Sequence, residues 1–91
     1  MKFIREHNKV YAKDEKGELL AEVVFPNVTN DTVSIDRTFV SPALRGGGVA
    51  GQLLEIAYDE IKRQGKKARA KCSYAVSWFQ KNEDKRDILV D

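Results

Sequence analysis

The sequence predicts an α+β fold in which a mostly antiparallel sheet packs against two helices. Between residues 9 and 40 apolar and polar side chains alternate in runs with a period of two, which is typical of strands with one buried face. From Val49 to Ile61 apolar residues recur at helical spacing, as expected for a helix with one face on that sheet. The expected order of elements is β-β-β-β-α-β-α.

The expected strands form a meander, and turn residues separate them. Gly17 closes one turn, where a residue with positive φ is useful, and Pro26 ends a mostly apolar strand. The last strand before the first helix alternates cleanly and places Val33, Ile35 and Phe39 on one face. These strands are expected at residues 3–5, 9–12, 18–25 and 32–40.

The second half of the chain is expected to be mainly helical. The first helix starts directly after the glycines and stops at Gly65, because glycine is common just beyond helix C-termini. It should be followed by a short basic strand at 66–71, a helix at 73–81 and a last strand or tail at 87–90.

Size, charge and cysteine content narrow the class of protein. A chain of 91 residues is expected to be one domain, residues 1–91. The net charge of +2 argues against nucleic acid as a partner. The single cysteine cannot form an internal disulfide, and no apolar run approaches the ~20 residues of a membrane span. We therefore expect a cytoplasmic protein with no membrane partner, either a monomer or a weak dimer.

The segment from Arg45 to Ala50 is the most informative part of the chain. Its glycines direct free backbone N–H groups and the positive end of a helix dipole at one small volume, which suits a pyrophosphate. Gly46, Gly48 and Gly51 also fit the spacing of a dinucleotide-binding loop, but that loop needs a buried parallel strand before it. A P-loop is excluded because no Gly-Lys-Ser/Thr follows. A glycine-rich turn without a ligand remains the alternative.

The pattern Arg45-x-x-Gly48-x-Ala50 resembles the acetyl-CoA signature of the GNAT superfamily of N-acetyltransferases. That family places the loop after a long antiparallel strand and before a long helix. The downstream segment 72–74, Cys-Ser-Tyr, makes the chain similar to small stand-alone GNAT-like proteins. The resemblance runs from about Leu19 to Lys81. It implies a minimal GNAT-like sheet without the helices that larger members insert between their first two strands, and hence an open or differently built acceptor site.

The resemblance also implies which residues hold acetyl-CoA, the co-substrate. The pyrophosphate is expected on backbone N–H groups of the loop, and the pantetheine arm beside the backbone at the end of the preceding strand. A main-chain N–H near Val40 is expected to bind the thioester carbonyl. The implied cofactor-binding residues are Phe39, Val40, Arg45, Gly46, Gly47, Gly48, Val49 and Ala50.

Cys72 and Tyr74 are the candidate catalytic residues. Cys72 precedes a helix and follows Lys71, and both neighbours stabilise a thiolate. It is a candidate to accept the acetyl group or to protonate the departing thiolate, and otherwise a small buried side chain. Many GNAT enzymes have a tyrosine acid where this chain has Phe79, which cannot donate a proton. Tyr74 is therefore a second candidate acid, with packing against Trp78 as the alternative.

The sequence says less about the general base and the acceptor. Asp36 and Glu22 lie on strands and are base candidates, although exposed strand carboxylates are often only solvated. No cluster of His, Cys and Asp indicates a metal site. The leading hypothesis is acetyl transfer from acetyl-CoA to an amine, on a small molecule or a protein. The alternative is a non-catalytic CoA- or acetyl-CoA-binding module or sensor, and a weaker third reading is an interaction module that uses the basic patch at 66–71.

Overall fold

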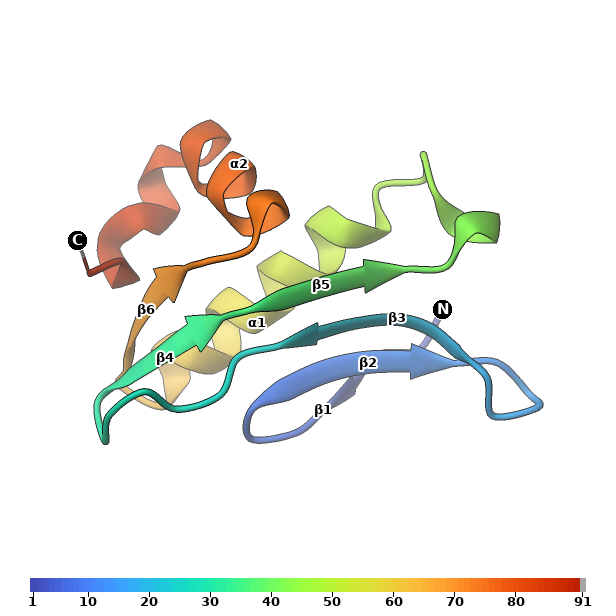
Figure 1. Ribbon diagram of the computed structural model, residues 1–91, viewed down its shortest axis with the longest axis horizontal. Helices are drawn as coiled ribbons and strands as arrows, with labels where there is room; N and C mark the ends of the chain where they lie inside the picture. The colour runs from blue at the N-terminus through green and yellow to red at the C-terminus, as the bar shows by residue number, and fades with distance from the viewer. Residues whose placement is uncertain (91) are drawn as a thin grey trace.

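The computed structural model describes residues 1–90 and has the expected α+β architecture, with two α-helices lying against strands (Figure 1). Within those residues neither helix is long and apolar enough to cross a membrane. In chain order the elements are β1 (Ile4–Arg5), β2 (Lys9–Lys13), β3 (Leu19–Val24), β4 (Thr32–Ile35), β5 (Arg37–Val40), a 3₁₀ helix (Pro42–Leu44), α1 (Val49–Arg63), β6 (Lys67–Ala70), α2 (Ser73–Lys81) and a second 3₁₀ helix (Glu83–Ile88).

The strands form two sheets. One continuous stretch of chain, residues 32–40, contributes β4 to one sheet and β5 to the other. An antiparallel sheet has the order β1-β2-β3-β5, so β5 lies at its edge. A separate parallel pair joins β4 to β6. The turn before β3 contains Gly17 at a φ of 83°, where a side chain would be strained, as the sequence predicts.

The last strand expected before the first helix is divided at Asp36. The sequence predicted one continuous strand, but its first half pairs with β6 and its second half with β3. The pairing slips by one residue between the pair Val24–Arg37 and the bridge Asn27–Val33. The chain therefore carries a β-bulge at this point, which leaves one extra residue on this strand.

The bulge also changes which side chains reach the core. Val33 and Ile35 are buried before it, whereas Val40 is buried after it and Phe39 is only half-buried. The prediction that Val33, Ile35 and Phe39 share one face is therefore wrong for Phe39. The extra residue shifts the alternation by one position, so Phe39 lies on the face of the sheet that points away from α1.

The core lies between α1 and one face of the four-stranded sheet. Alternate residues of β2 and β3 point toward the helix, because side chains along a strand alternate between faces. The fully buried large side chains are Val10, Val23, Phe25, Val33, Ile35, Leu53, Leu54 and Ile61. The opposite face carries the cross-strand row Tyr11, Glu22 and Phe39 and is covered by no helix in the described part of the chain.

The C-terminal segment is attached to α1 by a polar cluster. Asp87 accepts hydrogen bonds from the Tyr58 hydroxyl and the Lys62 ammonium group, both at 2.7 Å. The bond from Lys62 holds the pKa of Asp87 below its usual range, and Asp87 in turn raises the pKa of Lys62. The strand or tail expected at 87–90 forms a single parallel bridge, from Leu89 to Ala68 of β6.

Candidate functional site

The loop before α1 contains two glycines with left-handed backbone and leads directly into the helix. Gly46 and Gly48 have φ of 87° and 78°, and Gly48 is the N-cap of α1. No side chain caps this helix end and its first turn contains no acidic residue. The first N–H groups of the helix therefore lack a helical partner and carry the positive end of the dipole, with no carboxylate there to repel an anion.

A gap opens beside this loop because the two sheets diverge. The carbonyl of Ile35, the last residue of β4, accepts hydrogen bonds from the N–H groups of Lys71 at 3.1 Å and Cys72 at 3.0 Å. Beyond this point β5 continues along β3, whereas the chain after β6 turns into α2 (Figure 1). The β-bulge at Asp36 is thus the point at which the strands separate.

The gap forms a groove of about 270 Å³ lined by Thr38, Phe39, Val40, Arg45 and Tyr74. It brings together residues of β5, the glycine loop and α2 that are far apart in the sequence. Four of the five were singled out from the sequence, and Thr38 was not. Thr38 precedes a predicted site residue, but nothing in the alternation of its strand marks it.

One edge of β5 pairs with no other strand of residues 1–90, and this edge lies at the groove. The N–H of Ser41 donates to the carbonyl of Leu20 on β3 at 2.8 Å. Because hydrogen-bonding directions alternate along an antiparallel strand, Phe39 also directs its main-chain groups at β3, while Thr38 and Val40 direct theirs outward. Val40 and Thr38 thus offer main-chain hydrogen bonds at the groove, and Phe39 contributes its side chain.

Cys72 lies behind the groove and caps α2. Its sulfur accepts a hydrogen bond from the N–H of Ala75 at 3.4 Å and lies 3.4 Å from the hydroxyl oxygen of Thr38. Cys72 is half-buried, whereas Tyr74 lines the groove and is 52% exposed. Of the two predicted catalytic residues, only Tyr74 reaches the groove directly, because the sulfur of Cys72 is turned toward its own helix and Thr38.

The charged residues near the groove have defined partners. The guanidinium group of Arg45 donates to the carbonyl of Val40 at 3.4 Å. Glu22 lies opposite Phe39 on the uncovered sheet face, and its carboxylate is 3.6 Å from the guanidinium group of Arg37. The carboxylate side chain of Glu22 is 15% exposed, so it is shielded but still reachable from solvent.

The remaining sequence candidates lie elsewhere or have structural partners. Asp36 accepts a hydrogen bond from the Ser34 hydroxyl at the bulge. Phe79, at the position of the family's tyrosine, is 2% exposed and contacts Trp78 edge to face with ring centroids 5.0 Å apart. The ring centroids of Trp78 and Tyr58 are 6.5 Å apart. Trp78 therefore packs near Tyr58, whereas the sequence suggested packing against Tyr74. Among residues 1–90, no group of three or more His, Cys, Asp or Glu side chains is arranged to hold a metal ion.

The comparisons with known proteins agree on one family. A family model described as GCN5-related N-acetyl-transferase matches residues 9–88. The chain superimposes on the NMR structure of a GCN5-like protein from Staphylococcus aureus with a TM-score of 0.80 and 30% identity, covering 98% of this chain and 87% of that one. The comparison with curated proteins found no match.

Larger solved structures share the fold over part of their length. A GNAT family N-acetyltransferase from Escherichia coli in complex with CoA has a TM-score of 0.59 at 24% identity, over 68% of this chain and 38% of that chain. An N-acetylglutamate synthase from Neisseria gonorrhoeae, complexed with coenzyme A and N-acetyl-glutamate, has a TM-score of 0.65 at 21% identity, over 82% and 18% respectively. The predicted GNAT-like fold is therefore confirmed.

Proposed function

Since the chain belongs to the GCN5-related N-acetyltransferase family, we propose that it transfers an acetyl group from acetyl-CoA to an amine. The observation that carries the proposal is that the glycine loop and the unpaired edge of β5 meet at one groove. The loop supplies N–H groups for a pyrophosphate, and the strand edge supplies main-chain partners for an extended pantetheine arm.

Acetyl-CoA would be held from two sides of this groove. The pyrophosphate would lie at the α1 N-terminus, against the loop 46–48 and the N–H groups of Val49 and Ala50. The outward N–H of Val40 would donate a hydrogen bond to the oxygen of the thioester carbonyl. Negative charge develops on that oxygen in the transition state and would strengthen the bond. The guanidinium group of Arg45, which rests on the Val40 carbonyl, would swing toward the phosphates.

Acetyl transfer requires proton movements on both sides of the thioester. The amine nitrogen attacks the carbonyl carbon, the new C–N bond replaces the C–S bond, and the amine loses a proton while the CoA thiolate gains one. Tyr74 lines the groove and would protonate the thiolate. Glu22 lies one strand away on the uncovered face and would accept the amine proton. The acid would thus come from α2 at the edge of β5, and the base from the neighbouring strand β3.

The position of Cys72 supports a capping role more directly than a covalent one. Its sulfur is already bonded to the N–H of Ala75 and lies against Thr38. Direct transfer of the acetyl group to the acceptor is therefore the proposed route. Acetylation of Cys72 as an intermediate is the competing route, and intact mass after incubation with acetyl-CoA separates the two.

A non-catalytic acetyl-CoA-binding module or sensor is the second candidate. One observation favours it: the residue at the family's tyrosine position is Phe79, which is buried and has no proton to donate. This candidate predicts binding of acetyl-CoA without release of CoA thiol in the presence of any amine. The two candidates share the cofactor site and differ only in turnover.

The cofactor site can be tested with two matched glycine substitutions. Gly48 and Gly17 both have positive φ and open space around them, so Gly48→Glu and Gly17→Glu impose similar backbone strain. Only Gly48→Glu places a carboxylate beside the proposed phosphate site. By calorimetric titration, Gly48→Glu is expected to abolish acetyl-CoA binding and Gly17→Glu to retain it. Equal affinities in the two variants would contradict the proposed site.

The acceptor class can be found by measuring CoA release with a panel of amines. Glu22 lies on a sheet face that no helix of residues 1–90 covers, and discrimination among small amines requires buried contacts. We therefore expect lysine-containing peptides or protein N-termini to be acetylated at least as well as small amines. No CoA release with any amine, despite binding, would favour the sensor.

A further inference from the structure

The basic residues of β6 have no role in the site described above. Lys67, Arg69 and Lys71 occupy alternate positions along and just after this strand, so their side chains leave it on one face. The ammonium group of Lys67 donates to the carbonyl of Asp87 at 2.8 Å. Arg69 and Lys71 are exposed and form no ion pair with a carboxylate of residues 1–90. Two positive charges are therefore not neutralised within that part of the chain.

These charges lie on the side of the molecule that the helices leave open. Ala68 is buried in the core that includes α1, so its neighbour Arg69 points the other way. The uncovered face of the four-stranded sheet continues this surface, and there Lys9 and Arg37 both lie opposite Val24 of β3. We call the combined surface the basic face; its cations are Lys9, Lys13, Arg37, Arg69 and Lys71.

Aromatic rings hold three of these cations beside the proposed general base. The ammonium groups of Lys9 and Lys13 lie 5.0 Å and 5.6 Å from the ring centroid of Tyr11. The guanidinium carbon of Arg37 lies 5.4 Å from the ring centroid of Phe39. Tyr11 and Phe39 lie on either side of the proposed base in one cross-strand row. An amine that reaches this base therefore has positive charge on two sides.

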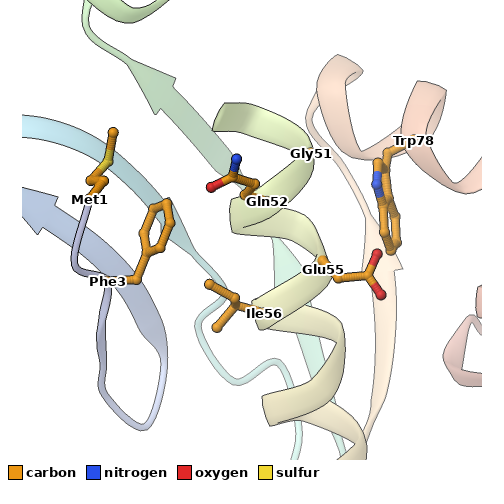
Figure 2. A pocket seen from close by; sticks show the side chains of 7 residues that line it. All are labelled: Met1, Phe3, Gly51, Gln52, Glu55, Ile56 and Trp78. Carbon is orange, nitrogen blue, oxygen red and sulfur yellow. The ribbon is translucent and has the colours of Figure 1, made fainter. Parts of the chain in front are cut away.

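The helix side of the molecule shows the opposite pattern, since acidic partners neutralise cations on and beside α1. A groove of about 590 Å³ on that side is lined by residues that include Gly51 and Trp78, and Figure 2 shows the side chain of Glu55 beside Trp78. The carboxylate of Glu55 lies 2.9 Å from the ammonium group of Lys85. Lys62 is paired with the C-terminal segment at 2.7 Å. Little uncompensated positive charge is left around this groove.

The ion pairs of the basic face are longer. The ammonium group of Lys9 is 3.8 Å from the carboxylate of Glu6, and the guanidinium group of Arg37 is 3.6 Å from that of Glu22. The side chain of Arg37 is 60% exposed. Exposed pairs of this kind contribute little to stability. The fold therefore gains little from the positive charge on this face, whereas an anionic partner would be attracted and oriented by it.

The spacing of the cations indicates the size of that partner. They lie on β2, β5 and β6, and three interstrand steps separate β2 from β6. At about 4.8 Å per step this corresponds to ~14 Å, which a small amine cannot span but about four or five residues of extended polypeptide can. A nucleic acid carries a phosphate at every residue and could not avoid the carboxylates of Glu22 and Asp36, which lie among these cations.

We infer that the acceptor is an acidic segment of polypeptide, which lies across the basic face with its carboxylates on Arg37, Arg69 and Lys71 and its amine at Glu22. The acceptor amine belongs to a lysine with aspartate or glutamate on both sides. The surrounding cations also favour the neutral form of this amine, which is the form that attacks the thioester. The inference rests on the proposed acetyl transfer and names the class of its acceptor.

Three peptides of equal length test the inference. Each has blocked termini and one central lysine, which is flanked by glutamate, by glutamine or by arginine; arginine adds positive charge without a second acceptor amine. Release of CoA gives kcat/KM for each peptide. We expect the glutamate-flanked peptide to be the best and the arginine-flanked peptide the worst substrate, with a difference of about tenfold or more. Raising the salt from about 0.05 M to about 0.5 M should reduce this difference, because salt screens exposed charges.

Removal of charge from β6 links the preference to the basic face. Arg69→Gln and Lys71→Gln change exposed side chains and should leave the fold intact. Each should lower the ratio of kcat/KM for the glutamate-flanked peptide to that for the glutamine-flanked peptide by about two- to fivefold, the effect of an exposed charge pair. Lys81→Gln removes an exposed charge from α2 and is the matched control, in which the ratio should not change.

The outcomes separate the inference from the proposed function. Equal kcat/KM for the three peptides, a ratio that falls equally in Lys81→Gln, or transfer to small amines alone would overturn the acidic acceptor and leave acetyl transfer in place. Binding of acetyl-CoA without CoA release, with any peptide or small amine, would overturn the proposed function and the inference with it. Single-stranded DNA that displaces the glutamate-flanked peptide more readily than a lysine-free acidic peptide of equal charge would overturn a polypeptide as the occupant.

Discussion

Cys72 can be examined by exchanging its sulfur atom for oxygen or removing it. In the structure the sulfur caps α2 by accepting the N–H of Ala75 and contacts the hydroxyl of Thr38. Cys72→Ser keeps an acceptor at the N-cap, where serine is a preferred residue, but removes the thiol. Cys72→Ala removes both. Comparison of the two variants therefore separates a capping role from a chemical role.

The expected effect on stability follows from the cap. Replacing a Ser, Thr, Asn or Asp N-cap by alanine typically costs about 1 kcal/mol, which is an upper bound for Cys72 because sulfur is a weaker acceptor than oxygen. For a domain of this size, 1 kcal/mol lowers Tm by about 4–8 °C. Cys72→Ala should therefore show a Tm lower by up to this amount, and urea unfolding should give a matching loss of free energy with an unchanged m value. Cys72→Ser should unfold close to the wild type.

Turnover gives the second half of this test. Because Cys72 lies behind Thr38, we expect Cys72→Ser to retain acetyl-CoA binding and CoA release at wild-type levels. Wild-type stability of Cys72→Ala would refute the cap. A Cys72→Ser variant that binds acetyl-CoA and unfolds normally but no longer turns over would refute this reasoning and indicate a catalytic thiol. The same conclusion would follow if the wild type gained the mass of one acetyl group and both variants did not.

Three further predictions concern the acid, the base and the C-terminal cluster. Tyr74→Phe should lower kcat by about 100-fold with little change in acetyl-CoA affinity, since an acid acts in the transition state; an unchanged kcat would assign Tyr74 to packing. Glu22→Gln should lower kcat by a similar factor of about 100, and a loss of cofactor binding instead would indicate a structural role for its pair with Arg37. Asp87→Asn should destabilise the fold above about pH 4, because the pKa of Asp87 is lowered by Lys62 and its contribution is lost as pH falls through that lowered value. The difference in unfolding free energy between Asp87→Asn and wild type should therefore shrink in acid, and a difference that persists there would contradict the assignment.

The local patterns of the sequence predict most of the individual elements correctly. The helices at 49–63 and 73–81 follow from apolar spacing and from the glycines at 46–48 and 65, and the structure places them there. These features depend on neighbouring residues, such as the positive φ of Gly48 at the helix start. Local propensity and the position of glycine are therefore sufficient to predict them.

The β-bulge at Asp36 could not be predicted from the same patterns. A strand of alternating residues has the same appearance whether or not an extra residue is accommodated, because the bulge is defined by the partner strands. The misplacement of Phe39 and the absence of Thr38 from the predicted site both follow from it. The pattern marked the end of the strand as important, but the side chains that reach the groove depend on the register with β3.

The sequence alone determined the fold class, the glycine loop and the family, since each depends on residues adjacent in the chain or on a short motif. Only the tertiary structure decided that β5 and β6 diverge, that Tyr74 and Thr38 share a groove with Arg45, and that Cys72 faces its own helix. It also showed that Gly51 and Trp78 line one surface. These relations join residues that are distant in sequence, and strand register and helix packing bring them together through contacts that no local pattern encodes.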